Sequence, residues 1–255
     1  MFGYIYSALS SWCLGYPDRA LANIRKAAAL AESSANRMDM LIVLGGENDL
    51  SAWRRDLGAV RRHSNATIEI GFAHGFTSGF LPTARARLGW VRARIDDPRA
   101  ALGEIEAALA EAEHQRDMPA ILSVLSLLAE VNRLAGERAA GLTAVKRLLS
   151  LMEQTGVEFC LAPAHQMLGD LLLIGENPDA EKATAAFRDA IRIARRQQAK
   201  SWELRATMSL ARLLAKQGHR DEARAMLADI YNWFTEGFDT ADLKDAKALL
   251  DELSA

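Results

Sequence analysis

Short breaks recur along this chain of 255 residues, and this repetition limits the possible folds more than any other feature. One series of breaks, each a Gly or Asp with Ala a few residues later, is spaced by 40, 39 and 43 residues and begins at Asp96, Gly136, Gly175 and Gly218. A second series lies midway, at Gly75, Asp117, Gly156 and Ala199. Two interleaved series with one period predict a two-helix unit that repeats head to tail.

The segments between the breaks have helical periodicity. In residues 202–214 the apolar side chains recur at steps of three and four. Gly136 and Gly218 suit the left-handed conformation that ends a helix. Asp97–Pro98 and Asn177–Pro178 are typical of an N-cap followed by proline in the first helical turn. The sequence has no alternating run bounded by hairpin turns, so an all-α fold is predicted.

The first third of the chain follows the pattern less closely. Residues 14–20 copy the break within a repeat, whereas the next break, expected at Gly45–Leu50, is degenerate. Six repeats result, which we expect to begin near residues 2, 36, 77, 118, 157 and 199. The prediction is one α-solenoid over residues 1–255, with two degenerate repeats in 1–75, four regular repeats in 76–236 and a capping helix in 237–255.

Truncation of the preceding parts of a parent chain would uncover the first helix of such a solenoid. Phe2, Ile5, Leu9 and Trp12 fall on this helix and would be bare. This pattern predicts self-association through residues 1–14.

The repeats resemble tetratricopeptide repeats. That family's unit has a Leu-Gly pair in its first helix, a turn seven residues later and alanines after the turn. Leu88–Gly89 is followed here by the turn at Asp96 and by Ala101 and Ala108. The resemblance implies a curved array whose first helices line the concave side. The period near 40 exceeds the family's period of about 34, which implies longer helices.

Three segments are similar to the C-terminal repeat region of large bacterial signalling proteins: Leu14–Leu21, Ala199–Ala206 and Trp233–Lys244. Those proteins join a class III adenylate/guanylate cyclase domain, a signal-transduction ATPase and a helical tail. The resemblance implies that this chain is a regulatory tail in the bacterial cytoplasm, with an ATPase domain among its partners. The sequence itself has no Gly-x-x-x-x-Gly-Lys-Ser/Thr phosphate loop and no paired metal-binding aspartates of a cyclase, so we expect no enzymatic activity.

Composition and charge exclude other classes of protein. Lys and Arg number 31 and Asp and Glu 33, for a net charge of −2, which argues against a nucleic-acid partner. Cys13 and Cys160 are too few for a disulfide scaffold or a thiolate zinc site, and the five histidines have no ligand spacing, so neither a metal nor a cofactor is expected. No apolar run approaches the roughly 20 residues that span a bilayer, so no membrane association is expected.

Arginines cluster on two predicted helices. An acidic partner could explain them, but the balanced net charge favours solvated faces answered by neighbouring Asp and Glu. The clusters are Arg85, Arg87, Arg92 and Arg94, and Arg188, Arg192, Arg195 and Arg196.

Aligning the repeats on their Leu-Gly pairs predicts which side chains lie on the exposed concave face. These candidate binding residues are Thr83, Trp90, Arg94, Ser126, Glu130, Arg133, Gln166, Asp170, Arg205, Arg212 and Lys216. A surface that mixes tryptophan with arginine and other polar groups suits an extended peptide or a domain edge. The sequence therefore predicts a non-catalytic protein-interaction scaffold. The alternative is a sensor that holds a small molecule or an oligosaccharide in the groove, stacked on Trp90.

Overall fold

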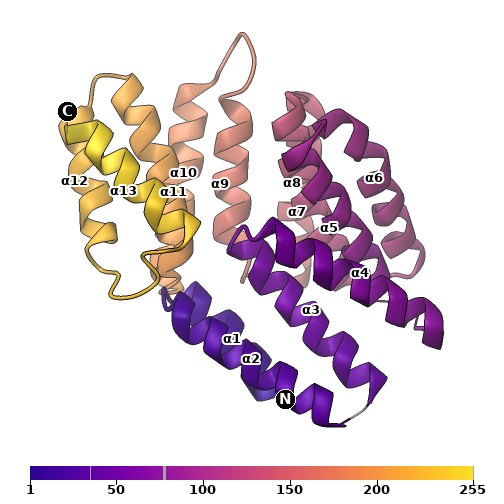
Figure 1. Ribbon diagram of the computed structural model, residues 1–255. Coiled ribbons are helices and arrows are strands. Elements are labelled where there is room, and N and C mark those ends of the chain that lie inside the picture. The colour runs from indigo at the N-terminus through magenta and orange to yellow at the C-terminus, as the bar shows by residue number, and fades with distance from the viewer. Residues whose placement is uncertain (35, 77–78, 255) are drawn as a thin grey trace.

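A computed structural model describes residues 1–34, 36–76 and 79–254. Within these ranges the chain forms thirteen α-helices and no strand (Figure 1). The helices are α1 (Phe2–Cys13), α2 (Pro17–Ser34), α3 (Arg37–Trp53), α4 (Leu57–His74), α5 (Phe80–Ile95), α6 (Pro98–His114), α7 (Met118–Ala135), α8 (Arg138–Thr155), α9 (Leu161–Leu172), α10 (Ala180–Arg196), α11 (Lys200–Lys216), α12 (Arg220–Tyr231) and α13 (Ala241–Ser254).

The helices form hairpins that stack side by side, which confirms the predicted α-solenoid. Each helix packs against the next one along the chain, and α5, α7, α9 and α11 also pack against one another across the hairpins. The last helix, α13, covers α11 and α12. The expected start of the third repeat near residue 77 lies outside the described residues, and its first helix begins at Phe80.

The chemistry of the breaks explains most of the helix ends. Gly75, Gly136 and Gly156 end α4, α7 and α8 with φ angles of 73°, 77° and 70°, as expected for left-handed C-caps. The side chain of Asp97 accepts a hydrogen bond from the backbone N–H of Arg99, so Asp97 caps α6.

The predicted N-cap at Asn177 is wrong. α10 begins at Ala180, and the carboxylate of Asp179 caps it by accepting from the N–H of Lys182. The carbonyl of Asn177 instead accepts a hydrogen bond from Arg138 of the preceding hairpin. This bond holds residues 175–179 as a loop.

The break expected at Gly45–Leu50 is also wrong, because these residues lie inside α3. Gly46 is required there by packing: a Cβ on it would lie 2.6 Å from Cγ2 of Ile5 in α1. The true break is at 54–56, where Arg55 takes the left-handed conformation with φ of 59° and Asp56 caps α4. A left-handed arginine leaves no glycine signal in the sequence.

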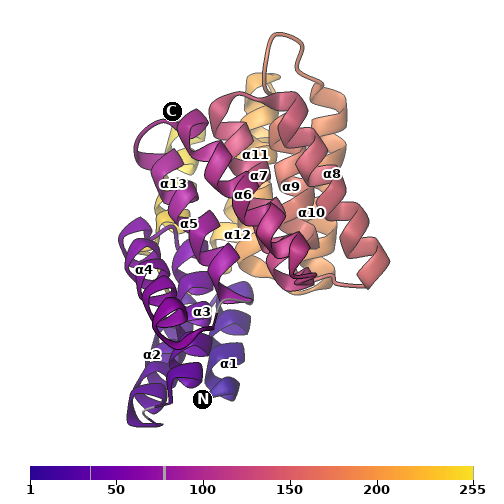
Figure 2. The ribbon, with the colours of Figure 1, turned by 90° about the vertical axis from the view of Figure 1, so that its right-hand side faces the viewer.

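The two ends of the solenoid meet. Ile5 and Trp12 are only 6% and 2% exposed, because a single apolar core joins them to Ile193, Ala199 and Trp202 of the fifth and sixth hairpins. Figures 1 and 2 show the indigo α1–α2 hairpin against the end of the orange α11–α12 hairpin. The expected bare N-terminal helix is therefore corrected in part: α2 and α3 cover most of it and α11 contacts it as well, whereas Phe2, Tyr4 and Tyr6 remain exposed.

One helix of the described chain, α7, is long and apolar enough to cross a membrane by length and composition alone. Half of it is buried inside the protein, where Val124, Leu125 and Ala129 contribute to the central core between α6 and α8.

Candidate functional site

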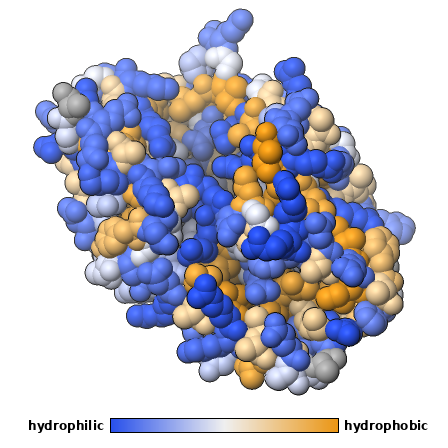
Figure 3. All heavy atoms as spheres, viewed as in Figure 1, coloured by the Kyte–Doolittle hydropathy of each residue, from blue (hydrophilic) through white to orange (hydrophobic). Residues whose placement is uncertain are grey.

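The first helices of the hairpins face a common cavity of about 1910 Å³. Its wall comes from α1, α3, α5, α7, α9 and α11, and α13 adds Asp242 and Asp245. Figure 3 shows the front face hollowed between the α9–α11 side and the α5–α8 side of the molecule. Because α1 of the N-terminal hairpin also contacts α11, the cavity is bordered by both ends of the solenoid, and it remains partly open to solvent.

All eleven candidate binding residues line this cavity. Ser126, Arg212 and Lys216 are exposed, Trp90 is buried, and the other seven are half-buried. The alignment of repeats therefore brings the candidates together in space, and their role in binding stays a prediction.

Four of these residues occupy equivalent positions in successive hairpins. Trp90, Glu130, Asp170 and Arg212 follow one another at intervals of 40, 40 and 42 residues. Each comes directly after a Gly or Ala that lets the second helix of its hairpin pack closely; a Cβ on Gly89 or Gly169 would lie 2.8 Å from Ile105 or 2.4 Å from Phe187. The next residue along the helix turns away from that partner helix and toward the cavity.

Trp90 does not lie exposed as a stacking platform, which corrects the sequence prediction. It is 3% exposed and belongs to the central core. The guanidinium of Arg94 lies 5.1 Å from the centre of its ring and pairs with Glu130 of α7 at 2.5 Å. The indole N–H of Trp90 is buried without a hydrogen-bond partner.

The arginines on α5 are paired with acids, as the charge balance predicts. Arg85 pairs with Glu111 and Arg92 with Glu104, both on α6. Arg87 pairs with Asp49 of α3. On α10, Arg192, Arg195 and Arg196 pair with acids as well, and Arg188 is exposed. These clusters are ion-paired faces of the solenoid.

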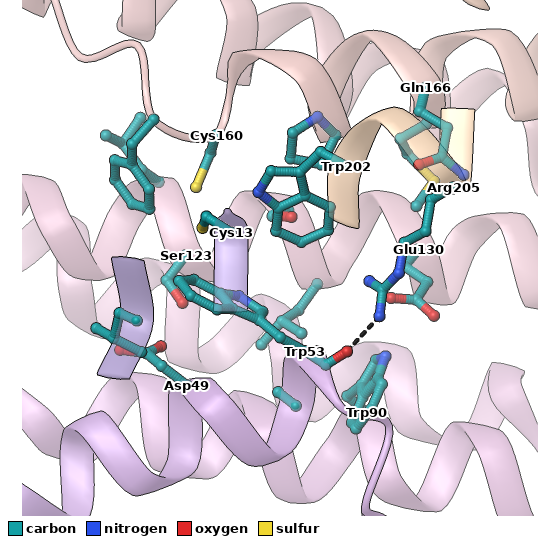
Figure 4. Close-up of a pocket in the computed structure, with 18 of the residues that line it drawn as sticks. Cys13, Asp49, Trp53, Trp90, Ser123, Glu130, Cys160, Gln166, Trp202 and Arg205 are labelled. Carbon is teal, nitrogen blue, oxygen red and sulfur yellow. Dashed lines mark hydrogen bonds between the residues drawn. The ribbon is translucent and has the colours of Figure 1, made fainter. Parts of the chain in front are cut away.

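An aromatic cluster, of which Trp53 and Trp202 line the cavity, was not predicted. Trp12, Trp53 and Trp202 come from α1, α3 and α11, and their ring centroids are 4.7–5.8 Å apart. The guanidinium of Arg205 lies 5.0 Å from the rings of both Trp12 and Trp202. It also donates hydrogen bonds to Asp242 at 2.9 Å and to the carbonyl of Trp53, the contact drawn as a dashed line in Figure 4. Arg205 is thus occupied in joining helices.

A second set of contacts joins the two ends of the chain. In these contacts residues 12–19 meet residues 200–205 and 233–237, and we call this set the seam. Glu236 accepts hydrogen bonds from the backbone N–H groups of Asp18 and Arg19 at 2.9 and 3.0 Å, and Asp18 accepts from the N–H of Gly237 at 3.1 Å. Ser201 donates to the carbonyl of Trp12 at 2.6 Å. The seam therefore brings together residues of three segments that are far apart in the sequence, 14–21, 199–206 and 233–244.

Glycines in the seam are required by close approach. A Cβ on Gly15 would lie 2.5 Å from the ring of Trp233, and one on Gly237 would lie 2.0 Å from Pro17. Both glycines also have positive φ angles, 93° and 76°. Side chains at these positions would force the two ends apart.

Asp170 has the most perturbed carboxyl group in the cavity wall. Burial raises its pKa from 3.8 to about 6, against the opposing influence of Arg133, Ser209 and Arg212. It is the only one of the five acids among the described lining residues that forms no ion pair.

The two cysteines, Cys13 and Cys160, also line the cavity (Figure 4). Burial raises the pKa of the Cys13 thiol to about 11 and that of Cys160 well above its ordinary value. Both remain protonated at neutral pH and are poor nucleophiles. Within the described residues no group of three or more His, Cys, Asp or Glu is placed to hold a metal ion.

No family model matches this sequence, and a search of the curated proteins finds no match. Among solved structures, the chain is similar to BtubC (BKLC) from P. vanneervenii, with 18% identity and a TM-score of 0.57 over 80% of this chain and 90% of that one. It is also similar to PH0952 from Pyrococcus horikoshii, a Signal Transduction ATPase with Numerous Domains (STAND) protein with a tetratricopeptide repeat sensor, with 14% identity and a TM-score of 0.53. That match covers 99% of this chain and 38% of the STAND protein. These likenesses confirm a helical-repeat fold of the tetratricopeptide kind.

Proposed function

We propose that this chain is a non-catalytic sensory scaffold that binds a small molecule in its central cavity. The observation that carries the proposal is the convergence of all eleven concave residues on one cavity that the seam borders. Ligand sites in proteins are concave, largely apolar and equipped with a few polar groups. Met208, Leu127 and Met167 beside Arg133, Gln166 and Asp170 give this wall that character.

A response to the ligand follows from the construction of the wall. Trp53 and Trp202 line the cavity and are also held by Arg205, which joins α11 to α3 and α13. A ligand that binds the closed and open forms with different affinity shifts the balance between them. The seam is the element through which an occupied cavity changes the shape of the solenoid.

A polypeptide segment is the second candidate occupant. The cavity volume of about 1910 Å³ exceeds the roughly 300–1,000 Å³ of ordinary small-molecule sites. Phe2 and Tyr6 line it and are 52% and 68% exposed, so they offer aromatic contacts at its edge. In this case the chain is a protein-interaction scaffold, the first interpretation of the sequence.

We further propose that the chain is the regulatory tail of a bacterial cytoplasmic nucleotide-cyclase or ATPase signalling protein. The resemblance of residues 14–21, 199–206 and 233–244 supports this role, because these segments form the seam. The description of PH0952 as a STAND protein with a tetratricopeptide repeat sensor supports it as well. An ATPase domain would then be the partner whose state the seam controls.

Native mass spectrometry tests the proposed function. The chain is incubated with a cytoplasmic extract, desalted and compared with Ser126→Trp, which places a bulky ring on the exposed cavity side of α7. The matched control is Thr143→Trp, an exposed position on α8 away from the cavity. We expect a bound small-molecule mass on the wild type and on the control, and none on Ser126→Trp. A bound polypeptide would favour the second candidate, and a mass that Ser126→Trp retains would contradict a cavity site.

A further inference from the structure

The cavity wall contains more positive charge than its own acids neutralise. Of the described lining residues, seven are basic and five are acidic. Arg55, Arg87, Arg94 and Arg205 are ion-paired with Asp49, Glu130, Asp242 and Asp245. The three basic residues that remain form no ion pair within the described chain: Arg133, Arg212 and Lys216.

These three residues lie on one stretch of the wall. Arg133 is in the last turn of α7, and Arg212 and Lys216 are one turn apart on α11, so they share a face of that helix. α9 packs between α7 and α11 and places Asp170 among them. Arg133 and Arg212 are both close enough to Asp170 to stabilise its charge. The cluster thus has two arginines beside the Asp170 carboxyl group and a lysine one turn beyond Arg212.

Unmatched hydrogen-bond donors accompany the charge. The Nε of Arg133 is buried and has no hydrogen-bond partner among the residues that the structure describes, and the same holds for the indole nitrogen of Trp90, whose residue is 3% exposed. Trp90 and Asp170 occupy equivalent positions in their hairpins, on either side of α7. Arginine and tryptophan side chains are donors only, so both need acceptor atoms.

We propose that Arg133, Arg212 and Lys216 form a subsite for an anionic group of the cavity ligand, a carboxylate or a phosphate of a small organic molecule. The guanidinium groups supply paired N–H donors that match two oxygens of such an anion, and the lysine adds a point charge. Asp170 is adjacent to the subsite. When the carboxyl group of Asp170 is ionised, its negative charge lowers the affinity of the subsite for dianions. This inference rests on the proposed function and specifies the chemical class of its ligand.

Isothermal titration calorimetry with two probes, inorganic phosphate and citrate, tests the subsite at an ionic strength held constant with sodium chloride. We expect saturable binding of at least one probe, and the stronger of the two identifies phosphate or carboxylate as the preferred group. Arg133→Gln combined with Arg212→Gln should weaken binding at least tenfold. Lys216→Gln, at an exposed position that cannot disturb the core, should weaken it several-fold.

Arg188→Gln is the matched control, because Arg188 is an exposed, unpaired arginine on α10 outside the cavity. It should bind within twofold of the wild type. Any of three results would overturn the subsite: the wild type binds neither probe, both cavity variants bind as tightly as the wild type, or Arg188→Gln weakens binding as much as the cavity variants do. Mass spectrometry could detect a neutral molecule whose binding Ser126→Trp abolishes, while calorimetry detects no anion binding. This combination would overturn the subsite and leave the proposed function standing. No bound molecule of any kind would overturn the function on which it rests.

Discussion

Arg205 donates a hydrogen bond to the main-chain carbonyl of Trp53, 152 residues earlier in the chain. The same guanidinium lies over the rings of Trp12 and Trp202 and pairs with Asp242. One side chain therefore joins α11 to α1, α3 and α13. It holds the first and last parts of the solenoid around the cavity.

Replacement of Arg205 should open this junction. Arg205→Ala removes a largely buried ion pair, two cation–π contacts and a hydrogen bond, and we expect a loss of about 2–4 kcal/mol in the free energy of unfolding. Urea unfolding followed by tryptophan fluorescence measures the change. The control is Lys216→Ala, because Lys216 is exposed on α11 and forms no ion pair with the residues that the structure describes. This variant should change the free energy of unfolding by less than about 0.5 kcal/mol. Equal stabilities of the two variants would contradict the role of Arg205.

Glu236 should stabilise the start of α2 from across the seam. Its carboxylate accepts from the first free N–H groups of that helix, at Asp18 and Arg19. Loss of such a cap costs about 1 kcal/mol. Amide hydrogen exchange of residues 18–20 should therefore accelerate in Glu236→Ala and stay unchanged in Glu153→Ala, which removes an exposed acid of α8. Unaltered exchange in Glu236→Ala would show that the seam is open in solution.

Trp90 should act in packing more than in contact with a ligand. Trp90→Ala leaves a cavity in the central core and should cost about 3–5 kcal/mol. Trp90→Phe keeps most of the volume, so it should cost less than about 2 kcal/mol while it removes the indole N–H. Thermal and urea unfolding of both variants measure these losses. An alanine variant as stable as the wild type would place the ring in solvent.

Asp170 should make stability depend on pH. Its pKa is raised on folding from 3.8 to about 6, so the folded state favours the protonated form. The resulting stabilisation is complete below about pH 4 and is lost as the pH rises through 6, a change of up to about 3 kcal/mol. Between pH 4 and 6 the free energy of unfolding of Asp170→Asn should therefore decline less than that of the wild type, by up to about 3 kcal/mol.

The control for Asp170 is Glu47→Gln. Burial raises the pKa of Glu47 from 4.5 to about 7, so its decline in stability extends to higher pH. Glu47→Gln should keep the part of the decline between pH 4 and 6 that comes from Asp170, and it should lose the part that extends to about pH 7. The same pH profile in wild type and Asp170→Asn would show that Asp170 is solvated.

The hairpins could be predicted because their signals are local. Gly136 and the Asp97–Pro98 pair fix helix ends through their own backbone preferences. The register of Trp90, Glu130 and Asp170 could be predicted for the same reason, since it follows from small residues at a fixed place in each first helix. Arg55 shows the limit of this reasoning: it adopts a left-handed conformation without any sequence signal.

The closure of the solenoid could not be predicted in the same way. It depends on a small rotation between each hairpin and the next, summed over six hairpins, and no local pattern encodes that sum. The contact between Trp12, Trp53 and Trp202 is therefore invisible in their spacing. Segments 14–21 and 233–244 stood out in the sequence, and the structure shows that they contact each other through Asp18, Glu236 and Gly237.

The contact between the N-terminal and C-terminal parts of the solenoid is tested most directly by a zero-length crosslink between residue 55 and α13. Arg55 pairs with Asp242 and Asp245 and is 27% exposed, so Arg55→Lys places a reactive amine beside two carboxylates of α13. Carbodiimide treatment of the monomer, followed by peptide mass spectrometry, should join residue 55 to Asp242 or Asp245. The surface pair Lys247 and Asp251 within α13 serves as the internal positive control. A crosslink between Lys247 and Asp251 without one from residue 55 would show that the solenoid is open and would contradict the closed cavity.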